Sequence, residues 1–221
     1  MKKTTLPTLL LAGLAFTAQA QDQPHKFEVG LEVLNFSPYV PTFYSYQDTR
    51  TFAKAQWVSG AIFRSNFGRF GLRSGVGYNA ETDNTDNTNC ADCLIGQTER
   101  KELRLTLGGQ YAPLKKAQWL YVFSDFYYRR FTSEANFSGG LCGCINSDVD
   151  IKSNGGGNNT GLGIKIKTFR HFYLNPEASY EVLRAWNTQT TTDRNTDHAT
   201  QFTSRTNGQG PALRLNAIYA F

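Results

Sequence analysis

Apolar and polar residues alternate along most of the chain beyond residue 25, with the two-residue period of β-strands and no competing helical period. The run from Phe27 to Val33 has apolar residues at odd positions and Glu28 and Glu32 at even ones. Its phase slips near Leu34, where we expect a β-bulge. Turn-forming residues bound each such run, which predicts eight strands, at residues 26–39, 55–67, 70–82, 97–112, 118–134, 151–168, 172–186 and 199–221.

The connections between these strands are short and long in strict alternation. The short ones are at residues 68–69, 113–117 and 169–171, and the long polar ones are at 41–54, 83–96, 135–150 and 187–198. This alternation is typical of an antiparallel up-and-down transmembrane β-barrel, with short periplasmic turns and long extracellular loops. An even number of strands places both chain ends on the periplasmic side.

The apolar residues share one face of each strand, and their aromatic members gather at two heights. Trp57 and Phe67 are ten residues apart on one face, which spans about 25 Å at a tilt near 40° and matches the apolar band of a membrane barrel. A soluble sandwich has no reason for such belts. The upper belt is expected at Trp57, Tyr78 and Tyr180, and the lower one at Phe67, Phe70, Tyr111, Phe172 and Phe221.

The N-terminal segment has the composition of a secretory signal peptide. Two lysines precede an apolar run from Leu6 to Phe16, and Ala18 and Ala20 frame a small-residue cleavage site. The run is too short for a transmembrane anchor, so residues 1–20 are expected to be removed, leaving one domain at 21–221. A net charge of +5 is too mild to indicate nucleic acid, and a mean hydropathy of −0.44 suits a soluble secreted protein as well as a barrel.

Charged residues lie opposite the apolar face, where a barrel of eight strands has room only for side chains. Such charges persist when they are paired or hydrated, so we expect an ionic network that fills the interior as a structural plug. A gated pore or proton path is the alternative. The expected members are Glu28, Glu32, Glu102, Asp125, Glu177 and Glu181, with Arg64, Arg73, Arg104, Arg129, Lys165 and Arg214.

Four cysteines occur in two of the long loops, at Cys90, Cys93, Cys142 and Cys144. The two loops are neighbours in this topology, and an exported protein meets oxidising conditions. We therefore expect disulfides between the loops. A four-thiolate metal site and free thiols are the alternatives.

Four basic residues fall on outward faces above the upper aromatic belt, at Lys101, Arg130, Arg184 and Arg205. Guanidinium groups match phosphate oxygens well, so these residues are candidate contacts to lipopolysaccharide. Ordinary solvated charges at strand ends are the alternative. His198 is expected in a loop, without a catalytic role, and no cofactor, metal or catalytic residue is predicted.

The chain ends on the strand pattern "NAIYAF". With the signal peptide, the alternating strands and the long outer loops, this resembles the OmpA/OmpX-like outer-membrane β-barrels of Gram-negative bacteria. The resemblance implies that Tyr219 and Phe221 form the signal read by the barrel-assembly machinery. The expected function is a non-enzymatic barrel whose loops serve adhesion, envelope stability or an extracellular partner. A narrow solute channel and a lipid-modifying enzyme are the alternatives.

Overall fold

The computed structural model describes residues 26–38, 53–85, 94–139 and 145–221. In these ranges the chain forms nine β-strands and no α-helix, so no described helix is long enough to cross a membrane. The strands are β1 (Phe27–Pro38), β2 (Ala53–Phe67), β3 (Phe70–Thr85), β4 (Leu94–Tyr111), β5 (Leu120–Gly139), β6 (Ile145–Ile164), β7 (Ile166–Lys167), β8 (Phe172–Asp193) and β9 (His198–Ala220).

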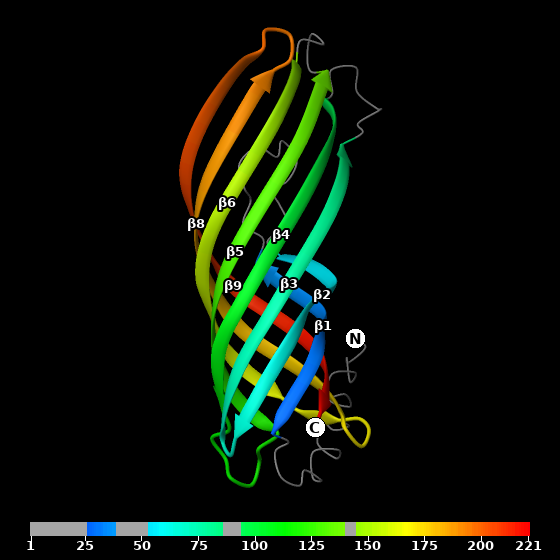
Figure 1. Cartoon of the computed structure of the whole chain (residues 1–221), viewed down its shortest axis with the longest axis vertical. Helices are drawn as coiled ribbons and strands as arrows, with labels where there is room; N and C mark the ends of the chain where they lie inside the picture. The colour runs from blue at the N-terminus through cyan, green and yellow to red at the C-terminus, as the bar shows by residue number, and fades with distance from the viewer. Residues whose placement is uncertain (1–25, 39–52, 86–93, 140–144) are drawn as a thin grey trace, which may run out of the picture.

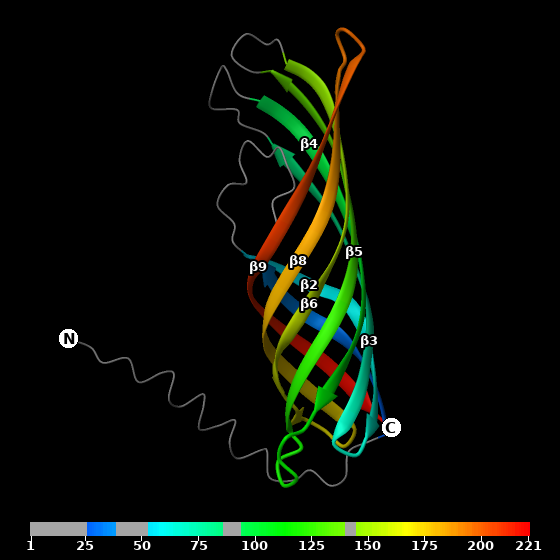
Figure 2. The same ribbon diagram turned by 90° about the vertical axis from the view of Figure 1, so that its left-hand side faces the viewer.

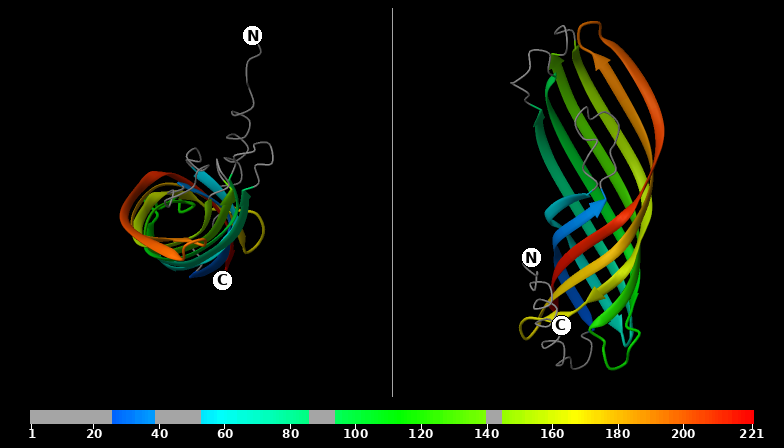
Figure 3. Two further views of the ribbon diagram at one scale, coloured as in Figure 1. Left: turned by 90° about the horizontal axis from the view of Figure 1, so that it is seen from above. Right: turned by 180° about the vertical axis from the view of Figure 1, so that it is seen from behind.

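The strands form one antiparallel sheet that closes into a ring (Figure 3). Each of β1 to β5 pairs with the next strand, β6 pairs with β8, β8 pairs with β9, and β9 returns to β1. The all-β antiparallel fold is thus confirmed. The sequence predicts eight strands, but nine are described because the strand expected at 151–168 breaks at Lys165. There the backbone nitrogen donates to the Trp119 carbonyl, 2.7 Å away, and β7 resumes pairing with β8 afterwards.

The strands are strongly staggered around the ring. Following paired residues from Leu31 leads through Ala61, Val76, Leu105, Tyr128, Gly156 and Arg184 to Asn207 on β9. Leu31 itself pairs with Ala217 on β9, which is 217 − 207 = 10 residues away. A stagger of this size tilts the strands by about 40° from the ring axis.

The ring is closed only in its lower part (Figures 1 and 2). Among the described residues, β2 pairs with β3 only as far as Gly77, and β1 pairs with β9 only as far as Leu213. Above that level β3 to β6, β8 and β9 continue as an open, curved sheet. Of the residues expected as long loops, 135–139, 145–150 and 187–193 are therefore strand.

A β-bulge lies where the sequence predicts one. The register of β1 shifts between Glu32 and Leu34 against both of its neighbours. On the facing strand Val58 has φ 49°, a left-handed conformation that is strained for a β-branched residue. The bulge moves Asn35 into the interior and Phe36 to the outer face, which explains the slip of phase in the sequence.

The inward face of the sheet also contains apolar clusters that the sequence pattern did not predict. One cluster joins Tyr127, Leu183 and Ala185, and a higher one joins Phe131, Val149 and Ile151. The second cluster pairs β5 with β6 above the closed part of the ring. Its burial is one physical reason why these strands extend beyond the expected limits, because it stabilises the extension.

Candidate functional site

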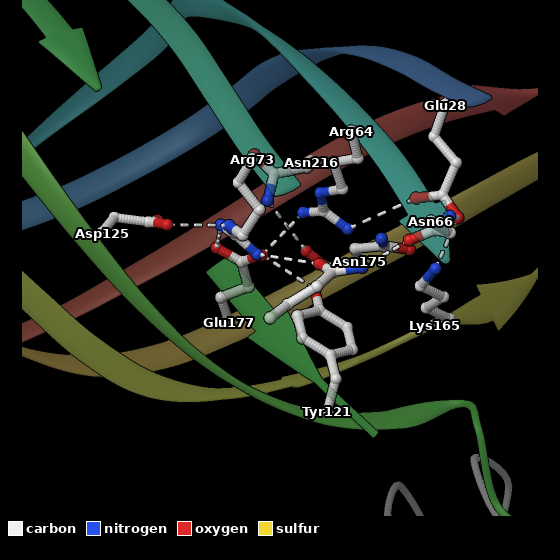
Figure 4. Close-up of polar contacts among 11 residues, drawn as sticks. Glu28, Arg64, Asn66, Arg73, Tyr121, Asp125, Lys165, Asn175, Glu177 and Asn216 are labelled. Atoms are coloured by element: carbon white, nitrogen blue, oxygen red, sulfur yellow. Dashed lines mark hydrogen bonds and ion pairs between the residues drawn. The ribbon is translucent and has the colours of Figure 1, made fainter. Parts of the chain in front are cut away.

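The centre of the ring holds Glu177 of β8 between two arginines (Figure 4). Arg64 donates from Nη2 to Glu177 Oε1 at 2.7 Å, and Arg73 donates to both carboxylate oxygens at 2.8 and 3.0 Å. The Tyr121 hydroxyl donates to the same Oε1 at 2.7 Å, and Arg73 Nε lies 3.0 Å from Asp125 Oδ1. The side chains of the two arginines and of Glu177 are each at most 1% exposed. Four strands are therefore joined through one carboxylate.

Below this centre, Glu28 of β1 connects the network to the base of the ring. Its carboxylate accepts a hydrogen bond from Asn66 Nδ2 at 2.8 Å, contacts Lys165 Nζ, and lies 3.7 Å from Arg64 Nη1. The Asn66 amide oxygen in turn accepts from Gln110 Nε2 at 2.9 Å. Lys165 continues the inward-facing odd positions of β6, and its ammonium group lies against Glu28 (Figure 4).

Above the centre, Glu181 of β8 organises a second group of charges. It accepts from Arg104 Nη2 at 3.1 Å and from the Tyr127 hydroxyl at 2.7 Å. The Arg104 guanidinium also lies 3.8 Å from the Tyr127 ring centroid, a cation–π distance. Arg214 lies between this carboxylate, at 3.7 Å, and Glu32, at 3.6 Å.

The structure brings all twelve expected interior charges into ion pairs with one another. The remaining pair, Arg129 and Glu102, joins Nη2 to Oε2 at 2.9 Å in the upper part of the ring. Buried charges lose their hydration, and pairing with further hydrogen bonds offsets that loss. Six acidic and six basic residues give this interior no net charge.

These side chains leave little free space inside the ring. A cavity of about 30 Å³ lies beside Arg73, Arg104, Arg214 and Asp125, which is room for about one or two water molecules. The buried Nε of Arg214 has no hydrogen-bond partner among the described residues, and such water would supply one. The arrangement can hold water and binds the strands of the ring together.

Glycines on β6 make room for the two tyrosines of the network. A Cβ at Gly163 would lie 2.3 Å from the Tyr121 ring, and one at Gly157 would lie 2.5 Å from the Tyr127 hydroxyl oxygen. Both contacts are shorter than real Cβ atoms allow. The strand that the tyrosines cross is therefore glycine-rich because the rings lie directly against its backbone.

The outer face of the closed part is apolar and ends in aromatic residues at its base. Phe70 lies 4.7 Å from Tyr111, and Tyr219 lies 5.0 Å from Phe172 and 4.9 Å from Phe221, between ring centroids. Exposed apolar side chains continue upward on the outer faces of the strands. They include Trp57, Phe63, Leu72, Val76, Tyr78, Leu105, Leu107, Phe126, Leu162, Tyr180, Val182 and Leu213.

The chain end takes part in closing the ring. The Phe221 nitrogen donates to the Phe27 carbonyl at 2.9 Å, so the last residue is fixed to the first strand. Cys90, Cys93, Cys142 and Cys144 lie outside the described residues. His198 is the exposed first residue of β9, not part of a loop as expected.

The four outward cations expected from the sequence are all exposed, but they differ in their neighbours. Lys101 has its Nζ 3.6 Å from Glu99 Oε2. Arg130, Arg184 and Arg205 form no ion pair within the described residues, and Arg205 lies 5.9 Å from the Trp186 ring. The exposed Lys152 belongs to the same surface, although it was not among the cations expected from the sequence. The strand pairing is what places it there.

No family model matches the sequence, and no curated protein is significantly similar to it. Among solved structures, a major outer membrane protein from Thermus thermophilus is similar, with a TM-score of 0.52 and 17% identity over 89% of this chain and all of that one. CarO of Acinetobacter baumannii gives a TM-score of 0.43 with 11% identity, and CarO2 gives 0.45 with 10%. They cover 91% and 90% of this chain, respectively, and all of their own. The first of these likenesses supports the fold.

Proposed function

We propose that this protein is an integral outer-membrane β-barrel without enzymatic activity. Its interior is a structural plug of paired charges, and its extended sheet and loops are presented at the cell surface for adhesion, partner binding or envelope stability. The observation that carries this proposal is the coincidence of two boundaries. The sheet is closed over the same height at which its outer face is apolar.

Backbone pairing explains why this coincidence indicates a membrane. Unpaired N–H and C=O groups are not tolerated in contact with lipid. In the described residues, β3 lacks a partner on its β2 side from Tyr78 upward, and β9 lacks one on its β1 side above Leu213. Tyr78 is also a member of the expected upper aromatic belt, and such belts lie at membrane interfaces. The open edges then face water, and only the closed part faces hydrocarbon.

The fold likeness to the Thermus thermophilus outer membrane protein supports this proposal. We further propose that residues 1–20 are a cleaved signal peptide and that Tyr219 and Phe221 serve the barrel-assembly machinery, as in the OmpA/OmpX-like barrels that the sequence resembles. The Phe221→Ala variant is expected to reach the outer membrane in lower yield than wild type. Unchanged yield would refute this role of the terminal aromatic residue.

A narrow channel is the second candidate, because the small cavity lies among three arginines of the interior. Conductance of the purified protein in planar bilayers separates the two functions. A plug predicts no steady unit conductance, with a porin measured in the same membranes as the positive control. Steady conductance that changes in Arg64→Gln or Arg104→Gln would establish the channel instead.

An enzymatic role in lipid modification has a direct test. Lipid A is extracted from cells with and without the protein and compared by mass spectrometry. We expect identical acyl chain and phosphate composition. A mass difference that depends on the protein would contradict the non-enzymatic assignment.

A further inference from the structure

Four cations gather on one sector of the outer face, on β5, β6, β8 and β9. A row of directly paired residues runs from Arg130 through Asn154 and Trp186 to Arg205. The row below contains Arg184, which is diagonal to Arg205 across β8 and β9, and the row above contains Lys152. Diagonal neighbours on one face of a sheet are about 7–8 Å apart, so neighbouring guanidinium groups of this sector can reach one ligand.

These cations are unlike the arginines of the interior. Every basic residue that was expected in the interior forms an ion pair, and Lys101 contacts Glu99. Arg130, Lys152, Arg184 and Arg205 have no carboxylate partner within the described ranges. Their charge is therefore available to an anion from outside the chain.

The height of this sector points to the origin of that anion. Along β5, Arg130 is the next outward residue above Tyr128, and along β8, Arg184 is the next above Val182. Tyr128 and Val182 are exposed and belong to the upper end of the apolar band. Arg130 and Arg184 therefore lie directly above the hydrocarbon boundary, at the level of lipid headgroups. Arg205 and Lys152 lie higher above the apolar residues of their own strands.

We propose that this sector binds the phosphate groups of a phosphorylated glycolipid in the outer leaflet. Arginine forks form paired hydrogen bonds with phosphate oxygens. Trp186 lies beside Arg205, at 5.9 Å, and limits the positions of its guanidinium. Gly156 lies between Tyr128 and Arg184 and has no side chain, so a phosphate has space to approach the guanidinium groups of Arg184 and Arg130.

The rows above and below the cations favour a glycolipid over free phosphate. Apolar side chains lie below, where acyl chains would run. Above, Thr132, Thr188 and Thr203 share the row of Lys152 and offer hydroxyl groups to sugars. The next row places Glu134 directly opposite Asp150, so negative charge limits the phosphate site on its upper side.

This inference rests on the membrane orientation of the proposed function, and its test separates the two. Folded protein in detergent is titrated with bisphosphorylated lipid A, and separately with the same lipid after phosphate removal, and bound lipid is counted by native mass spectrometry. The variant is Arg184→Gln with Arg205→Gln. The control is Lys115→Gln with Lys116→Gln, which removes the same charge from the exposed turn at the base.

We expect phosphorylated lipid A to bind at least roughly tenfold more tightly than the dephosphorylated lipid, since charge-assisted hydrogen bonds are lost with the phosphates. The arginine variant should lose this preference and the control should keep it. Replacement of both arginines by lysine should retain part of it, because the charge remains without the fork. Millimolar inorganic phosphate should not displace the lipid.

Three results would overturn the inference: equal binding of the two lipids by wild type, an unchanged preference in the arginine variant, or equal losses in variant and control. Each protein is first shown to shift in electrophoretic mobility on boiling. Wild-type protein that shows no such shift contradicts the proposed barrel itself. A barrel that shifts but lacks the phosphate preference contradicts only the lipid site.

Discussion

Replacement of Glu177 by glutamine tests the role of the ionic interior. The substitution keeps the size of the side chain and removes the charge that Arg64 and Arg73 share. The glutamine amide group also presents N–H donors to two guanidinium groups that are donors themselves. Two buried cations then lack their main counter-charge.

The structure gives the size of the expected loss. Removing one partner of a buried ion pair costs roughly 3–5 kcal/mol. Arg73 keeps Asp125 at 3.0 Å, and Arg64 keeps Glu28 at 3.7 Å. These remaining pairs place the expected loss in unfolding free energy at the lower end, about 3 kcal/mol.

The matched control is Glu102→Gln. Glu102 has one ion pair, with Arg129, and its side chain is 22% exposed. Water can replace part of the lost contact, so the substitution should cost less than Glu177→Gln, about 1–2 kcal/mol. Urea unfolding of both variants in lipid vesicles, followed by tryptophan fluorescence, gives the two free energies. Equal unfolding midpoints for Glu177→Gln and Glu102→Gln would refute the central position of Glu177 in the network.

Other parts of the fold give further expected outcomes. Gly163→Ala should lower the unfolding free energy by about 1–3 kcal/mol, because the new Cβ displaces Tyr121. Gly109→Ala should be nearly neutral, since the atom nearest to its new Cβ is 3.7 Å away. Urea unfolding compares the two variants, and equal losses of free energy would contradict the close packing of Tyr121 against Gly163. At the upper tip of the sheet, the hydrogen bond from Arg194 lowers the pKa of Asp148. That bond should persist at pH values above the ordinary aspartate pKa and be lost as the pH falls through the lowered pKa of Asp148. Arg194→Gln should raise the pKa of Asp148, measured by carboxyl NMR, and an unchanged titration would exclude the pair in solution.

The sequence predicted the closed lower part well, because two-residue alternation reports directly on which face is covered. The bulge near Leu34 follows from the same pattern, since a slip of one residue exchanges the two faces. The twelve interior charges could be identified because each lies opposite an outward apolar residue. Their individual partners could not, since Arg64 and Glu177 are 113 residues apart and meet only through the stagger of the ring.

Above the closed part of the ring, the sequence pattern is less informative. There both faces of β8 and β9 carry mainly Thr, Asn, Gln and Ser, so little alternation of apolar and polar residues distinguishes strand from loop. Residues 187–193 of β8 were therefore expected as loop, and Lys152 was not recognised as part of the outer cationic sector. The break at Lys165 was also hidden, because it depends on a backbone hydrogen bond to Trp119.

The most direct test of the account is electrophoresis of membrane fractions, boiled and unboiled, with and without reductant. A closed outer-membrane barrel predicts that the protein occurs in the outer-membrane fraction and migrates differently before and after boiling. A further shift with reductant would support disulfides among the four loop cysteines. Protein that remains soluble and migrates identically in every lane would contradict the membrane barrel.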